Sequence, residues 1–188
     1  MPVAIAAIET SSIAQGAVVG DALVKTAHIE LIDASMLSPG KYWLLIGGEV
    51  APVRAAYRRG LEVAADTLID SLLIPQLHDS VIPALRGVVP ADDDDALGVI
   101  ETLSAASALL AADHAAKAAQ VRLRDLRLAN GLGGKGVLML SGSVGDVEAA
   151  VAAGRAEALR RGLLARSVVV PRLHPQMKER IFGCISRG

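Results

Sequence analysis

The chain has 188 residues, of which 52% are hydrophobic and only 2% aromatic, and its formal net charge is −1. This length is enough for one medium domain or for two small ones of roughly 90 residues each. The balanced charge leaves no basic excess for nucleic acid or an anionic membrane surface, so neither is expected as a partner.

The first 87 residues predict seven elements. Apolar runs indicate buried strands, alternation indicates a half-buried strand, and a 3.6-residue period indicates helices. The first helix places Ile13, Ala17, Gly20 and Val24 on one face. The order strand-helix-strand-strand-helix-strand-helix is a split βαβ pattern, in which helices cover an antiparallel sheet. In chain order the bounds are a strand at 3–10, a helix at 11–27, strands at 28–36 and 42–47, a helix at 51–66, a strand at 68–75 and a short helix at 78–87.

The second half of the chain repeats this succession. The tripeptide Ile-Glu-Thr at 8–10 returns at 100–102, and Asp-x-x-x-Lys-x-Ala at 21–27 returns at 113–119. The offset between the copies grows from 92 to 94 and then 96 residues, as shown by Glu9 and Glu101, Lys41 and Lys135, and His78 and His174. An internal repeat of this length indicates two similar domains in tandem.

A short acidic segment separates the repeats. Residues 88–95 contain a proline and four consecutive aspartates, which cannot be buried, so we expect an exposed linker. The domains are therefore expected at 1–87 and 96–188.

The only cysteine, Cys184, follows near the end of the chain. A single cysteine excludes an internal disulfide framework and fits a reducing cytosol. The apolar start of the chain has no basic region before it, and no uncharged apolar stretch is long enough to span a bilayer. We expect a soluble cytoplasmic protein.

A Gly-Lys pair precedes a predicted strand in both repeats, at Lys41 and Lys135. A phosphate-binding P-loop requires Ser or Thr after the lysine and a helix after the loop. Tyr42 and Gly136 follow instead, and both loops lead into strands, so a nucleotide site is excluded. The glycines are expected to supply unusual backbone angles and close approach.

Both repeats resemble the shell domain of bacterial microcompartments (BMC). The resemblance is carried by AIAAIET and ALGVIET, by the D-x-x-x-K-x-A pattern, by the Gly-rich loop, and by G-x-V-x-x-V-x-A-A and the closing P-x-L-H, which together cover nearly the whole chain. It implies an α/β (α+β) fold of two tandem ferredoxin-like domains, with antiparallel sheets and helices on their faces. The motifs look most like those of the trimeric shell proteins of propanediol-utilisation microcompartments.

The resemblance implies a structural role and no enzymatic activity. Members of this type form homotrimers that act as pseudo-hexagonal tiles, join other BMC shell proteins edge to edge, and surround encapsulated enzymes in the cytoplasm. A central pore passes small metabolites.

The family also assigns positions to individual residues. Its tile-edge contacts correspond to Lys25, Lys117 and Arg172, and the first repeat has Gln76 where the second has Arg172. The loops that line the axis of the tile correspond to Ser38, Pro39 and Gly40 and to Asn130, Gly131, Leu132, Gly133 and Gly134.

One position departs from the propanediol-type relatives. They carry a cysteine just before Pro-Gly-Lys, and three copies hold an iron–sulfur cluster at the threefold axis. This chain has Ser38 there, and serine is a poor ligand for such clusters. Cys184 lies in a different segment. We therefore expect no cofactor and no bound metal, and disfavour the alternative of an electron-transfer shell protein.

Several repeated residues allow a second interpretation. Lys25 and Lys117 can form helix-surface pairs with Asp21 and Asp113, which are worth only about 0.3–0.5 kcal/mol, so an edge contact is favoured. The histidines are interpreted as capping or packing residues at His78 and His174, and as surface or edge residues at His28 and His114.

Glu9 and Glu101 end the first strand of each repeat. Two carboxylates can act as an acid–base pair, but no catalytic triad, metal cluster or cofactor motif accompanies them. A cap on the following helix or a subunit contact is favoured. The glycines of the second loop are compatible with a turn that needs positive φ angles or with a gate, and the sequence does not separate the two.

Overall fold

The computed structural model describes residues 3–88 and 96–185 and divides into two compact units. The units differ from the sequence repeats, because each includes short segments of the other repeat. Most of the predicted acidic linker, residues 89–95, lies outside the described residues. The first unit comprises Met1–Leu77, Ser104–Ala106 and Ala129–Gly134, and the second comprises His78–Leu103, Ser107–Leu128 and Lys135–Gly188.

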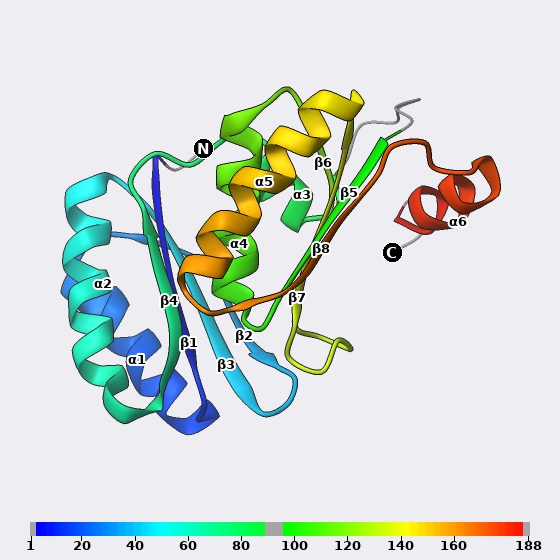
Figure 1. The fold of residues 1–188 in the computed structure, drawn as a ribbon. Helices are drawn as coiled ribbons and strands as arrows, with labels where there is room; N and C mark the ends of the chain where they lie inside the picture. The colour runs from blue at the N-terminus through cyan, green and yellow to red at the C-terminus, as the bar shows by residue number, and fades with distance from the viewer. Residues whose placement is uncertain (1–2, 89–95, 186–188) are drawn as a thin grey trace. The chain divides into compact units, whose positions relative to one another are not determined.

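The first unit is built on a four-stranded sheet in the order β2-β3-β1-β4, with each neighbouring pair antiparallel. Helices α1 and α2 pack against each other on one face of this sheet (Figure 1). Its elements are β1 (Ala4–Thr10), α1 (Ile13–Thr26), β2 (Glu30–Leu37), β3 (Lys41–Gly48), α2 (Val50–Ala64), the 3₁₀ turn η1 (Ala65–Thr67) and β4 (Leu68–Ile74).

The second unit repeats this topology, with a sheet in the order β6-β7-β5-β8. Helix α5 packs on β5 and β8, and the short helix α3 packs against β6. The elements are α3 (Val81–Leu85), β5 (Ala96–Thr102), α4 (Ala105–Ala118), β6 (Arg122–Leu128), β7 (Gly136–Gly142), α5 (Val144–Arg160), β8 (Leu164–Val170) and α6 (Pro175–Ile185).

The two sheets agree in detail as well as in order. The register shifts between Glu9 and Thr10 in the first sheet, and between Glu101 and Thr102 in the second. A further shift falls between Leu31 and Asp33, and again between Leu123 and Asp125. The predicted fold class of two tandem antiparallel α/β domains is thereby confirmed.

Serine side chains cap the first turns of α1 and α5. Ser12 Oγ accepts a hydrogen bond from the Gln15 backbone N–H at 3.2 Å, and Ser143 Oγ accepts one from Asp146 at 3.2 Å. Each cap satisfies one of the N–H groups that a helix leaves unpaired in its first turn. No helix among the described residues is both long enough and apolar enough to cross a bilayer.

The face predicted for α1 is wrong as a core face. Ile13 and Val24 are 39% and 45% exposed, whereas Gly16, Val19 and Leu23 are buried. The reason is that α1 carries small or apolar residues on both sides, and close approach to the sheet selects the side with Gly16. A Cβ atom at Gly16 would overlap the side chain of Tyr42 on β3.

The contact between α4 and α5 depends on a glycine in the same way. A Cβ atom at Gly154 would lie 2.8 Å from the Ala111 backbone oxygen and 2.7 Å from Ile100 Cδ1. A backbone oxygen cannot turn aside as a flexible side chain can, so the helices pack this closely only around glycine.

Replacing Gly154 with alanine is expected to destabilise the protein by about 1–3 kcal/mol, because α4 and α5 must separate. Gly145→Ala on the same helix is the matched control. Its Cβ would meet nothing within 4 Å, so stability should stay the same or rise by up to about 1 kcal/mol. Urea unfolding at one fixed chain concentration measures both. Equal midpoints for the two variants would contradict this account of the packing.

Candidate functional site

The two Gly-rich loops meet inside the first unit. The loop between β2 and β3 contains a cis Ser38–Pro39 bond, and the loop 129–134 belongs to the same unit. A Cβ atom at Gly134 would lie 3.1 Å from Pro39 Cδ and 3.4 Å from the Ser38 backbone oxygen. Two segments separated by more than ninety residues in sequence are therefore neighbours.

The second loop is shaped by residues with positive φ. Ala129 has φ 57°, and Gly131, Gly133 and Gly134 have φ 72°, 61° and 88°. This region is readily open to glycine and costly for most other residues. Leu132 donates its N–H to the Ala129 carbonyl at 3.1 Å, which closes a turn. The insertion that raises the repeat offset from 92 to 94 falls in this loop and makes it longer than the first.

The predicted axis residues differ in exposure. Pro39, Gly40, Asn130, Gly131 and Gly133 are exposed, whereas Gly134 is buried. Ser38 and Leu132 are half-buried. Gly134 therefore serves the close packing of the two loops.

Glu9, at the end of β1, is fully buried and forms an ion pair with the partly exposed Lys41. One carboxylate oxygen accepts from Lys41 Nζ at 2.7 Å, and the other accepts from the backbone N–H of Ala105 at 2.9 Å and of Ala106 at 3.5 Å. Ala105 and Ala106 open α4, where unpaired N–H groups and the helix dipole favour a negative charge. Glu9 caps the first turn of α4, not the helix that follows it in sequence.

This ion pair explains why a lysine follows the Gly-rich loop in both repeats. Lys41 neutralises Glu9, and its counterpart Lys135 reaches Glu101 at 3.1 Å. Both glutamates and both lysines stand out as repeated residues in the sequence. No local sequence pattern indicates that they form ion pairs, because each glutamate and its lysine lie on separate strands. Their constant order in the two repeats was the one signal that could have paired them.

The predicted edge lysines both carry the expected helix pair. Lys25 Nζ and Lys117 Nζ each lie 2.6 Å from an aspartate oxygen, of Asp21 and of Asp113 respectively. The environments differ: the side chains of Lys25 and Asp21 are 72% and 59% exposed, whereas that of Asp113 is 3% exposed. Both lysines reach solvent.

Asp113 is buried because it also binds backbone. Its Oδ1 accepts the N–H of His78 at 2.8 Å, and His78 Nδ1 lies 2.8 Å from Ser80 Oγ. His174 Nδ1 accepts the Gln176 N–H at 3.3 Å at the start of α6. His78 and His174 thus have the capping and packing roles expected of them. Arg172 is exposed on the segment between β8 and α6, and Gln76 is exposed after β4.

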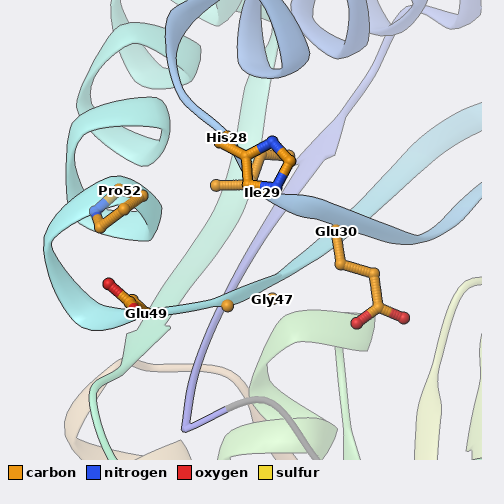
Figure 2. Close-up of a pocket in the computed structure, with 7 residues that line it drawn as sticks. His28, Ile29, Glu30, Gly47, Glu49 and Pro52 are labelled. Carbon is orange, nitrogen blue, oxygen red and sulfur yellow. The ribbon is translucent and has the colours of Figure 1, made fainter.

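A pocket lies where β2 begins and β3 ends, beside the first turn of α2 (Figure 2). His28, Glu30 and Glu49 contribute its polar groups, and Ile29, Gly47, Gly48 and Pro52 line the rest. In Figure 2 the His28 ring lies beside Ile29, while the Glu30 side chain points away from Pro52. Among the residues that the structure describes, no group of three or more His, Cys, Asp or Glu side chains could hold a metal ion.

Glu9→Gln is expected to lower the free energy of unfolding by about 1.5–3 kcal/mol, since it removes the buried charge that Lys41 and the start of α4 need. The control is Glu62→Gln, which breaks an exposed ion pair with Arg59 and should cost less than about 0.5 kcal/mol. Urea titration of both variants compares the two. A Glu9 variant as stable as the control would show that this junction is not a main source of stability.

The comparisons with known proteins agree with this geometry. Residues 4–77 and 96–173 each match the BMC domain. The bacterial microcompartment shell protein PduT of Citrobacter freundii is 41% identical, over 94% of this chain and 96% of its own length. A crystal structure of a microcompartment protein from Desulfitobacterium hafniense is 41% identical, with a TM-score of 0.83, and covers 94% of this chain and 98% of its own.

A shorter relative shows the duplication directly. The bacterial microcompartment shell protein EutM of Salmonella typhimurium is 38% identical over 94 residues, which are 95% of its own length but 50% of this chain. One copy of the domain makes up nearly all of that relative and half of this protein. The chain therefore belongs to the family of BMC-domain shell proteins and carries the domain twice in tandem.

Proposed function

We propose that three copies of this chain assemble into a pseudo-hexagonal tile of a microcompartment shell in the cytoplasm. The observation that carries this proposal is the repetition of one sheet topology, with the Gly-rich loops of both repeats packed together within the first unit. Three tandem chains bring six similar domains around one axis, and closed cyclic symmetry completes the ring.

The loops are the natural lining of an opening at that axis. Ser38, Pro39 and Gly40 alternate with the loop at 130–134, and most of these residues are exposed in the single chain. Backbone groups, the Ser38 hydroxyl and the Asn130 amide supply hydrogen-bonding groups with no net charge. Such a lining suits small polar metabolites, selected by width and hydrogen bonding.

The tile is proposed to lack an iron–sulfur cluster and to carry no enzymatic activity. Cluster irons are held by thiolates, and the loop offers the Ser38 hydroxyl at the position where relatives are expected to carry cysteine. The residues at this loop do not fit the group. The lysines and glutamates near the loops are engaged with one another, which suits structural pairing.

The tile edge is proposed to use Lys25, Lys117 and Arg172. Their side chains reach solvent, and both lysines are held by an aspartate one helical turn earlier. Because Gln76 replaces arginine in the first repeat, the two kinds of edge differ in charge. Neighbouring tiles and other shell proteins of this family are the expected partners, with enzymes enclosed behind them.

Native mass spectrometry of the gently purified protein should give a trimer of about 58 kDa from chains of 19.4 kDa, with no added mass. Ser38→Cys, reconstituted with iron and sulfide, is the positive control for the mass of a cluster. Added iron and sulfide on the unaltered trimer would contradict the assignment of Ser38. A monomer would contradict the tile.

Lys25→Ala combined with Lys117→Ala is expected to abolish extended sheets while the trimer mass persists, since only contacts between tiles are lost. Electron microscopy of the assemblies reads this out. Arg59→Ala, which removes another exposed helix cation, should leave the sheets intact. Normal sheets from the double lysine variant would refute the edge assignment.

A further inference from the structure

The backbone N–H groups that Glu9 and Asp113 accept from each belong to the other repeat. Glu9 belongs to the first repeat and accepts from the N–H groups of Ala105 and Ala106 in the second. Asp113 belongs to the second repeat and accepts from the N–H of His78 in the first. The duplication gives every one of these groups a counterpart elsewhere in the chain.

The counterparts follow from the repeat offsets. Glu101 corresponds to Glu9, and Ile13 and Ala14 at the start of α1 correspond to Ala105 and Ala106. Asp21 corresponds to Asp113, and His174 corresponds to His78. The sheet register supports the first match, because Glu9 and Glu101 sit at the same shift in their sheets.

The counterpart carboxylates are open to solvent. The side chain of Glu9 is 0% exposed and that of Asp113 is 3% exposed, whereas those of Glu101 and Asp21 are 34% and 59% exposed. Glu101 keeps its lysine, and Asp21 keeps Lys25. Within residues 3–88 and 96–185, neither carboxylate has the backbone N–H partner that its buried equivalent has.

The apolar surface around them shows the same difference. Ile13, Ala17 and Val24 of α1 are exposed. The corresponding residues of α4, Ala105, Leu109 and Ala116, are 0%, 0% and 7% exposed. The apolar face of α4 is buried within the chain, whereas the matching face of α1 is exposed to solvent. The contacts that bury α4 therefore indicate the kind of surface that would bury α1.

We infer that a second copy of this chain supplies the missing partners. Glu101 of one copy accepts from the N–H groups of Ile13 and Ala14 of the next, and Asp21 of that next copy accepts from the His174 N–H of the first. The α1 face (Ile13, Ala14, Ala17, Asp21 and Val24) thus docks against the Glu101 face (Glu101 and His174). This inference rests on the proposed trimer and names its contacts.

Such an interface is head-to-tail, since the two faces are different surfaces of one chain. Head-to-tail contacts close into a ring when the rotation between copies permits, and otherwise form open filaments. A ring of three would contain three such interfaces, each repeating contacts already formed inside every chain. Burial of Asp21 and Glu101 at these interfaces would also remove water from their existing ion pairs with Lys25 and Lys135.

The test compares how tightly the trimer holds together. Glu101→Ala and Asp21→Ala each remove an acceptor for a backbone N–H, so the chain concentration at half-dissociation should rise at least about tenfold. Glu62→Ala and Arg59→Ala, which each break an exposed ion pair on α2, are the matched controls and should leave the concentration unchanged. Mass photometry over a dilution series measures this, and urea unfolding of the dissociated chain checks that the variants remain folded.

The outcomes separate the two proposals. An unaltered protein that never forms a trimer refutes the proposed tile. A trimer that dissociates at the same concentration in the Glu101 and Asp21 variants as in the controls refutes these contacts and leaves the tile standing.

A mixing experiment tests the head-to-tail geometry. Asp21→Arg damages only the α1 face, and Glu101→Arg damages only the Glu101 face, so neither variant alone should form trimers. Mixed at equal amounts, they retain one intact combination of faces and should give a dimer of about 39 kDa that cannot close. Trimers from either variant alone, or a mixture with no dimer, would overturn the assignment.

Discussion

The structure depends on one buried carboxylate. Glu9 has no contact with water, so its charge is tolerable only if cations and N–H groups surround it. Lys41 and the first turn of α4 provide them. This requirement ties together the end of β1, the start of β3 and a helix of the second repeat. The first unit therefore cannot be assembled from the first repeat alone, which is why it includes residues 104–106 and 129–134.

Duplication makes the same requirement appear twice, with different outcomes. Glu101 still pairs with Lys135, but its side chain is partly exposed to water. Because water solvates this carboxylate, the absence of further hydrogen-bond partners costs little free energy. A single chain can therefore fold while Glu101 and the surface around it remain exposed to solvent. The apolar residues of α1 belong to the same surface and are not explained by the packing of the first unit, whose core uses Val19 and Leu23.

The sequence was sufficient for the fold and insufficient for its contacts. Internal repetition and strand and helix periods are local properties, so they predicted the element order. The inward face of α1 was not predictable, because Ile13 and Val24 are as apolar as Val19, and only the close approach of Tyr42 to Gly16 decides between them. The Glu9–Lys41 pair was missed because its members lie on separate strands. The unit boundaries were missed because they follow contacts and not sequence order.

The unequal lengths of the two Gly-rich loops carry a consequence for how this protein can change. In a ring of six identical domains, any substitution at the axis appears six times, so its effects on width and polarity are multiplied at once. In the tile that we propose for this tandem chain, Ser38 can be substituted while Asn130 stays constant, and the reverse. In the proposed trimer, the tandem chain therefore allows the two loops at the opening to vary independently, whereas a ring of six identical domains would keep sixfold symmetry.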